Sequence, residues 1–154
     1  MSPDWLIRRA SPNDLDAILE IAQACAEAPH WSHAQWLAAL IPNQNTAPMR
    51  AVFAAERNGG ILGFAVASRA GELAELESVA VSQSARRKGI GKALCLEVMD
   101  WSRNAGASEL ELEVRASSDG ALKLYRSLGF VEQAHRRQYY RNPTEDAVLM
   151  AARL

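Results

Sequence analysis

A short basic loop with two glycines, Arg86-Arg87-Lys88-Gly89-Ile90-Gly91, has the composition of an anion-binding site. It stands directly before an amphipathic segment, and the N-terminus of a helix offers unpaired backbone N–H groups and a partial positive charge. Gly89 and Gly91 lack the Cβ atoms that would keep a phosphate away from the backbone, and Lys92 adds positive charge. A solvated turn has a similar composition, and the loop is neither a Walker A motif nor a dinucleotide fingerprint. Its chemistry indicates a diphosphate ligand.

Two side chains in the second half of the sequence, Glu113 and Tyr125, are of types that transfer protons. Glu113 lies in an alternating run of glutamates and apolar residues, which is typical of a strand with one solvated face. Tyr125 lies on the apolar stripe of a predicted helix, where a tyrosine is by default a core aromatic with its hydroxyl at the edge. On the residues alone, the structural and catalytic interpretations of both side chains stay open.

Turn and cap signals divide the chain into segments in the order βααβββαβαββ. Strands are expected at residues 5–9, 50–56, 61–68, 74–81, 109–114, 130–138 and 147–151. Helices are expected near 15–22, 32–40, 89–103 and 118–128. Ser32 can cap the second helix and Ser117 or Ser118 the fourth. Asn58-Gly59-Gly60 predicts a hairpin, and Pro42-Asn43-Gln44-Asn45 predicts a polar loop.

Composition predicts a single domain spanning residues 1–154, because the chain has 154 residues and is 49% hydrophobic. The formal net charge of −1 gives no global field that would attract nucleic acid or an anionic membrane. We find no signal peptide and no apolar run of roughly 18 residues, so a cytoplasmic protein is expected. Cys25 and Cys95 form no CxxC or Cys/His cluster, which predicts two buried structural thiols and no metal site.

The basic loop and a later segment together resemble the GNAT acyltransferase superfamily. Residues 86–91 match its Q/R-x-x-G-x-G/A motif, and Ala121-Leu122-Lys123-Leu124-Tyr125-Arg126-Ser127-Leu128-Gly129-Phe130 matches its A-x-x-L-Y-x-x-x-G-F stretch. Ile7-Arg8-Arg9-Ala10 and the order of elements are also similar. The resemblance implies an α/β (α+β) fold with a central mixed, mostly antiparallel seven-stranded sheet and about four flanking helices. It also implies that acetyl-CoA binds between the fourth and fifth strands.

The resemblance assigns the cofactor site to the fourth strand and the loop that follows it. Backbone groups of Val79 and Val81 would bond the pantetheine arm, and the loop would hold the pyrophosphate. Ser118 stands where the family commonly has a cofactor-contacting asparagine, and a serine there can cap the helix and make one shorter contact. The residues implied to bind acetyl-CoA are Val79, Ala80, Val81, Arg86, Arg87, Lys88, Gly89, Ile90, Gly91, Lys92 and Ser118.

Four further segments, residues 29–32, 112–117, 136–140 and 145–147, are similar to the RimI-type ribosomal-protein-alanine N-acetyltransferases. By that resemblance Glu113 is the proton acceptor and Tyr125 the proton donor. Glu77 is the rival base, because many GNAT enzymes place a glutamate in the fourth strand. It could instead recognise the positive charge of the acceptor amine.

The implied reaction is transfer of acetyl from acetyl-CoA to an α-amino group at a protein or peptide N-terminus, for example that of a ribosomal protein. Transfer through a ternary complex is favoured over a covalent enzyme intermediate. Trp31, Trp36 and residues 139–141 would line the acceptor groove, although both tryptophans could equally anchor the core. Another GNAT enzyme acting on a small amine, a lysine side chain or an antibiotic is the alternative. Two further alternatives are a noncatalytic acyl-CoA sensor and a nucleotide-binding module. Nothing in the sequence selects an oligomeric state.

Overall fold

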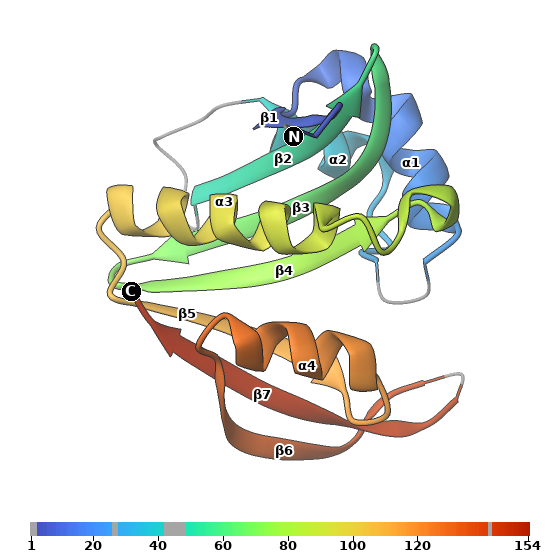
Figure 1. The fold of residues 1–154 in the computed structure, drawn as a ribbon. Coiled ribbons are helices and arrows are strands. Elements are labelled where there is room, and N and C mark those ends of the chain that lie inside the picture. Colours follow the sequence, from blue (N-terminus) through green and yellow to red (C-terminus); the bar gives the residue numbers. More distant parts are fainter. Residues whose placement is uncertain (1–2, 26–27, 42–48, 142) are drawn as a thin grey trace.

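A single mixed sheet of seven strands forms the centre of the computed structural model, which describes residues 3–25, 28–41, 49–141 and 143–154 (Figure 1). The strand order is β1-β2-β3-β4-β5-β7-β6. The predicted order of elements and the predicted sheet are confirmed, while the loop expected at residues 42–45 lies outside the described residues. The strands are β1 (Leu6–Arg9), β2 (Met49–Arg57), β3 (Gly60–Ala70), β4 (Leu73–Val81), β5 (Glu109–Arg115), β6 (Val131–Tyr140) and β7 (Glu145–Arg153).

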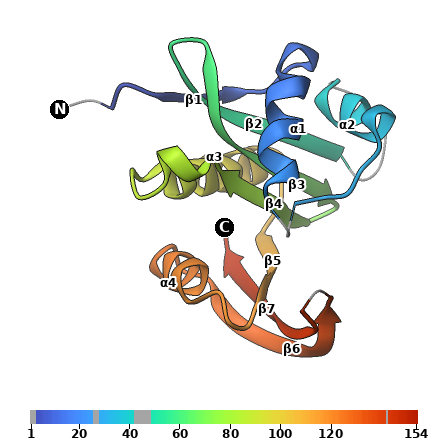
Figure 2. The same cartoon turned by 90° about the vertical axis from the view of Figure 1, so that its right-hand side faces the viewer.

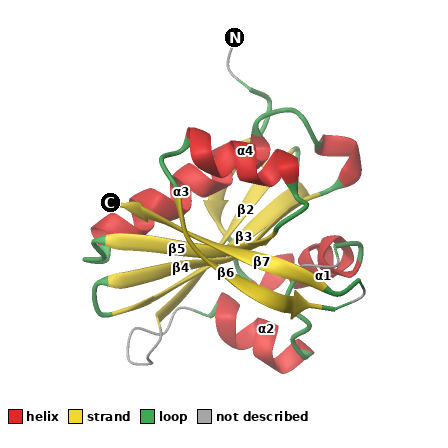
Figure 3. Ribbon diagram, turned by 90° about the horizontal axis from the view of Figure 1, so that it is seen from below, coloured by secondary structure: helices red, strands yellow, loops and turns green. Residues whose placement is uncertain are grey.

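Helices cover both faces of this sheet, with α1 and α2 on one face and α3 and α4 on the other (Figure 3). Side chains alternate along the inner strands, so Ala51 and Phe53 pack toward α3 while Val52 and Ala54 pack toward α1 and α2. Both faces of β2 and β3 are therefore buried, which explains their nearly continuous apolar sequence. The helical elements are η1 (Pro12–Asp14), α1 (Leu15–Gln23), α2 (His33–Leu40), η2 (Gln83–Ala85), α3 (Ile90–Asn104) and α4 (Asp119–Ser127).

The hairpin between β2 and β3 has a two-residue turn, because Arg57 pairs with Gly60. Asn58 and Gly59 have φ angles of 51° and 83°, in the left-handed region that asparagine and glycine tolerate best. This turn sets the register that buries alternate residues of both strands.

One extra residue distorts β4 in the middle of the sheet. Val66 of β3 pairs with Ser78, but the next residue of β3, Ala67, pairs with Leu76, so Glu77 is an inserted residue. Such a bulge bends its strand and increases the local twist. Before the bulge, Leu76 packs on the α3 side of the sheet, and after it Val79 and Val81 do so.

The parallel ladder between β4 and β5 is short and ends just before this bulge. Leu73 to Glu75 pair with Glu109 to Glu111, and no later pair joins the two strands among the described residues. Beyond that point the strands move apart (Figure 1), and Figure 2 shows the sheet as an upper part, β1–β4, and a lower part, β5–β7. The bulge and the divergence together open the sheet at its centre.

Helix starts agree only partly with the expected caps. Ser32 caps α2 through a capping box, since its Oγ accepts the N–H of Gln35 at 3.2 Å and its own N–H donates to Gln35 Oε1 at 2.7 Å. Ser118 occupies the N-cap position of α4, but its hydroxyl makes no capping hydrogen bond to the described backbone. Its ψ of 70° lies outside the extended region that aims a capping side chain at the helix, so Ser118 occupies the predicted position without making the expected side-chain bond.

The expected burial of both cysteines holds for Cys95 and is wrong for Cys25, which is half-buried. Cys25 follows the end of α1 instead of lying within it, because the helix stops at Gln23. Cys95 lies on the inner face of α3, and burial raises its pKa to about 12. A thiol in that environment stays protonated at neutral pH and is a poor nucleophile.

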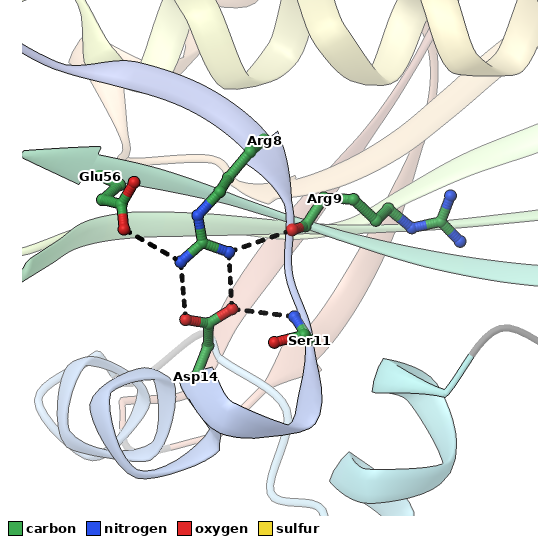
Figure 4. A network of polar contacts seen from close by, with 5 residues as sticks. All are labelled: Arg8, Arg9, Ser11, Asp14 and Glu56. Carbon is green, nitrogen blue, oxygen red and sulfur yellow. Dashed lines mark hydrogen bonds and ion pairs between the residues drawn. The ribbon is translucent and has the colours of Figure 1, made fainter. Parts of the chain in front are cut away.

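Arg8 ties the first strand to the segment that starts α1 (Figure 4). Its guanidinium donates two hydrogen bonds of 2.8 Å to the two carboxylate oxygens of Asp14 and reaches Glu56 at 3.4 Å. The backbone N–H of Ser11 also donates to Asp14, at 2.8 Å. The hydrogen bonds from Arg8 are the main cause that lowers the pKa of Asp14. The Ile7-Arg8-Arg9-Ala10 segment therefore has a structural role.

Replacement of Asp14 by asparagine is expected to lower the free energy of unfolding by about 1–2 kcal/mol at pH 7, since Arg8 is one-third exposed and its charge is partly screened. Because the folded pKa of Asp14 is lowered, its stabilisation is complete above the ordinary value of 3.8 and is lost as the pH falls through the folded pKa. Urea unfolding of both proteins at pH 7, 4 and 3 measures the difference, which should shrink only below about pH 4. Asp4→Asn is the control, because that carboxylate is 71% exposed and lies 3.7 Å from Arg57. A difference that persists unchanged at pH 3 would contradict the assignment.

Candidate active site

Two hollows meet where β4 and β5 separate. The acidic hollow, about 290 Å³ in volume, is lined by β4, β5 and the β6–β7 hairpin, including Glu75, Glu77, Glu113, Ser118, Tyr125, Tyr139 and Tyr140. The basic hollow, about 620 Å³, is lined by the end of β4, the β4–α3 loop and α4, including Val79, Ala80, Val81, Arg86, Arg87, Gly89, Ile90, Gly91 and Lys92. Cys25, Val79, Ala121 and Tyr125 line both. A ligand that fills one hollow therefore reaches the other at Tyr125.

The backbone of the β4–α3 loop has the conformation of an anion site. Arg87 and Gly89 have φ angles of 65° and 84°, and Gly89 is the N-cap of α3. Left-handed residues near a helix start turn successive N–H groups toward one point, where a phosphate can accept them. Nine of the eleven residues predicted to bind the cofactor line the basic hollow; Lys88 lies in the loop but is not among the lining residues, and Ser118 lines the acidic hollow.

The outer edge of β4 is suited to an extended ligand that contains amides. The N–H of Ser82 donates to the carbonyl of Leu62 at 2.8 Å, on the β3 side of the strand. Because backbone groups alternate sides along a strand, those of Val79 and Val81 are directed toward β5, which has moved away. The carbonyl of Val81 accepts the Nε–H of Arg86 at 3.3 Å. A pantetheine arm in this gap and a pyrophosphate at the loop fit the residues present.

Replacement of Gly89 by alanine is expected to raise the KM for acetyl-CoA roughly tenfold, equivalent to about 1.4 kcal/mol. An alanine disfavours the φ of 84° and would shift the N–H groups of the loop. Gly106→Ala is a matched control, because Gly106 has a φ of 96°, and a Cβ at either glycine meets no described atom within 4 Å. Steady-state kinetics should show the higher KM only for Gly89→Ala, while thermal unfolding should show a similar loss of stability in both. Equal KM values in the two variants would refute the role of the loop.

Glu113, in the acidic hollow, has one carboxylate oxygen near an arginine and one that is buried. Its side chain is 19% exposed, and Oε1 lies 3.4 Å from Nη2 of Arg136. The other oxygen, Oε2, is buried and has no hydrogen-bond partner in the described part of the chain. The alternation of β5 places Glu113 on the face opposite Leu112, whose side chain packs in the core. A buried carboxylate oxygen without a partner can accept a proton or a positively charged group.

Other carboxylates surround it and make the hollow negative. Partial desolvation is the largest cause that raises the pKa of Glu75, and the charges of Glu77 and Glu113 come next. Carboxylates that influence one another in this way lie close together, so the hollow favours a cationic occupant. We find no group of three or more His, Cys, Asp or Glu side chains placed to hold a metal ion in the described residues.

Glu77, the rival base, forms a bidentate ion pair. The Nε and Nη2 groups of Arg50 donate to its two oxygens at 2.8 and 3.0 Å. The guanidinium of Arg50 lies 4.9 Å from the centre of the Trp31 ring, which contacts Trp36 edge to face at 4.8 Å. Trp36 is only 1% exposed, so it is a core residue and the expectation that it lines the acceptor groove was wrong. Arg50 was not recognised in the sequence, because its partner lies on a different strand.

Tyr125 lies at the junction of the two hollows, on the inner face of α4. It is 7% exposed and packs edge to face on Phe130 at 5.8 Å. Burial is the main cause that raises its pKa, so the hydroxyl stays protonated at neutral pH. It therefore has a proton to donate at the point where the hollows join.

Arg115 is a second functional candidate that sequence patterns did not reveal. It is 8% exposed and donates to the carbonyls of Arg141 and Pro143, each at 3.0 Å. Its guanidinium also lies 4.6 Å from the centre of the Tyr140 ring. It fixes the β6–β7 hairpin against the end of β5, beside the acidic hollow.

Among the helices of the described residues, none is long and apolar enough to cross a membrane.

The chain is similar to known acetyltransferases in sequence and in fold. Residues 15–130 match the Acetyltransferase (GNAT) family. The ribosomal protein bS18-alanine N-acetyltransferase of Escherichia coli strain K12 is 41% identical over 103 residues, which are 64% of this chain and 68% of that protein. The N-alpha-acetyltransferase RimI of Mycobacterium tuberculosis strain H37Rv is 34% identical over 119 residues, 75% of this chain and 73% of that protein.

Solved structures show the same architecture over nearly the whole chain. The crystal structure of the ribosomal-protein-S18-alanine N-acetyltransferase from Escherichia coli has a TM-score of 0.81 and 34% sequence identity, covering 97% of this chain and 93% of that one. The family match covers most of this chain, and it includes the basic loop, Glu113 and Tyr125. The chain therefore belongs to the GNAT family of acetyltransferases, and it is an N-acetyltransferase that takes its acetyl group from acetyl-CoA.

Proposed function

We propose that this enzyme acetylates the α-amino group of a protein N-terminus that begins with alanine, with a ribosomal protein as the natural acceptor. The observation that carries the proposal is that the acidic hollow joins the basic hollow at Tyr125. Relatives named as alanine N-acetyltransferases of ribosomal protein bS18 support this acceptor. The catalytic unit is the whole chain as one domain, residues 1–154, and a ribosomal acceptor would place it in the cytoplasm.

Glu113 is the proposed proton acceptor. An α-ammonium group must lose a proton before its nitrogen can attack a thioester, and a base within the hollow removes that proton directly or through a water. The unpartnered Oε2 of Glu113 is available for this step. Glu77 is less suited, because Arg50 occupies both of its oxygens. Glu77 and Glu75 contribute instead to the negative charge that attracts the ammonium group.

Tyr125 is the proposed proton donor. Acetyl-CoA supplies the acetyl group and leaves as a thiol, so the departing sulfur needs a proton. Tyr125 lines both hollows, and its hydroxyl keeps its proton at neutral pH. We favour direct transfer between the two bound substrates over an acetyl-enzyme. Cys95 lines neither hollow and its buried thiol is a poor nucleophile, while Cys25 lines both hollows and is given no role in this proposal.

A panel of acceptors tests the proposal. A short peptide with a free N-terminal alanine should be acetylated at its α-amino group, as measured by mass spectrometry. The same peptide with a blocked N-terminus and an internal lysine is the matched control and should stay unmodified. Acetylation of the lysine peptide or of free small amines, with none of the alanine peptide, would favour the alternative GNAT activity and rule out the proposed acceptor.

A further inference from the structure

Strand β6 is distorted next to the acidic hollow. Its ladder to β7 pairs Arg136 with Ala147 and then Tyr140 with Glu145, so residues 137–139 of β6 lie opposite the single residue Asp146. Gln138, in the middle of the distortion, has a φ of 52°, which a glutamine rarely adopts. Its N–H donates to Oδ1 of Asp146 at 2.9 Å. Asp146, which lies opposite the distortion, therefore accepts a hydrogen bond from the strained residue at its centre.

The distortion changes which side chains share a face of the sheet. In a regular strand, residues 136 and 139 would point to opposite faces, because they are three positions apart. Here both are near Glu113. Nη2 of Arg136 lies 3.4 Å from Glu113 Oε1, and the negative charge of Glu113 is the largest cause that raises the pKa of Tyr139. The Arg136 guanidinium also lies 5.4 Å from the centre of the Tyr139 ring.

Asp146 is also fixed from the opposite side. Its backbone carbonyl accepts the N–H of Ala116 at 3.0 Å, at the end of β5. Further along β7, Leu149 pairs with Glu113 itself. Asp146 therefore joins the distorted part of β6 to the strand that carries Glu113.

We propose that Asp146 is a positioning residue whose carboxylate holds the distortion of β6 and thereby sets Tyr139 and Arg136 against Glu113. This inference rests on the proposed role of Glu113 as the proton acceptor. It gives Asp146 an effect on the acceptor side of the enzyme and none on the basic hollow, which its contacts do not reach.

A tyrosine titration tests the proposal without any acceptor. The chain has three tyrosines, so ¹³C labelling of tyrosine gives few signals, and Tyr139→Phe identifies the relevant one. The groups that act on Tyr139 are Glu113 and Glu75, which raise its pKa, and Arg136, which lowers it. In Asp146→Ala the pKa of Tyr139 should fall toward the ordinary value of 10.0, as it should in Glu113→Gln. Asp146→Asn keeps an oxygen acceptor for the Gln138 N–H and should titrate like the wild type.

A second variant perturbs the same distortion from the other strand. Gln138→Val places a β-branched side chain at a positive φ, and it should lower the pKa of Tyr139 as Asp146→Ala does. Asp100→Ala is the control, since Asp100 is a 67% exposed residue of α3 that pairs with Arg103, three residues later on the same helix. An unchanged pKa of Tyr139 in both Asp146→Ala and Gln138→Val would overturn the inference. So would a fall of the Tyr139 pKa in Asp146→Asn as large as that in Asp146→Ala.

Kinetics with the N-terminal alanine peptide separate this inference from the proposed function. Asp146→Ala should raise the KM for the peptide roughly fivefold to tenfold, about 1.0–1.4 kcal/mol, and leave the KM for acetyl-CoA unchanged. A parallel rise of both KM values would indicate general destabilisation and contradict a positioning role. Failure of the wild type to acetylate the peptide would refute the proposed acceptor, while the tyrosine titration would still decide the role of Asp146.

Discussion

Glu113→Gln is expected to lower kcat for peptide acetylation by roughly 10² to 10⁴, the range that general-base catalysis contributes. Glutamine keeps the size of the side chain and can still accept a hydrogen bond, but it cannot take a proton from the ammonium group. The KM for acetyl-CoA should stay unchanged, because Glu113 lines the acidic hollow and is not among the residues that line the basic one. Release of CoA thiol at saturating concentrations of both substrates measures the effect.

The matched control is Glu111→Gln, two residues earlier on the same face of β5. Glu111 contributes to the negative charge near Glu75 but does not line the acidic hollow, so a small effect on the KM for the peptide is expected and kcat should be retained. A second comparison is Glu77→Gln, which disrupts the pair with Arg50 and should affect peptide binding more than turnover. Full turnover in Glu113→Gln, or an equal loss in Glu77→Gln, would remove Glu113 from the mechanism.

Tyr125→Phe is expected to lower kcat by roughly 10² or more, since it removes the proton donor for the departing sulfur. The phenylalanine ring keeps the contact with Phe130, so the melting temperature should change little. The two KM values should also be retained, which would separate a role in turnover from a role in binding. A variant that keeps full kcat, or one that loses activity only in proportion to its stability, would exclude Tyr125 as the acid.

Local signals in the sequence predicted most of this fold. The alternation of Leu110 and Leu112 with glutamates, the Asn58-Gly59 turn and the helical spacing of Leu94 and Val98 are each set by neighbouring residues. The same is true of the basic loop, whose glycines and charges are contiguous. Such features need no knowledge of how distant strands are aligned.

Features that depend on strand register could not be predicted in this way. Arg50 and Glu77 are 27 positions apart and meet only because β2, β3 and β4 are aligned with one extra residue in β4. The distortion at Gln138 likewise has no local signal, since glutamine is an ordinary strand residue and its strain comes from pairing with Asp146. The assignment of Trp36 to the core also depended on packing, here against Phe64 at 5.6 Å.

The single inserted residue in β4 also limits how this sequence can change during evolution. Deletion of Glu77 would place Ser78 directly after Leu76, so Val79 and Val81 would stay on the α3 side of the sheet and their backbone groups would still be directed toward β5. The bulge itself would be lost, and with it the local bend and twist of β4 at the point where its pairing with β5 ends. A straighter β4 is expected to run on beside β5 and to narrow the gap between the two strands. A substitution at this position leaves the number of residues in the strand unchanged. Homologues with this site should therefore vary in the type of residue at the bulge and keep the number of residues constant.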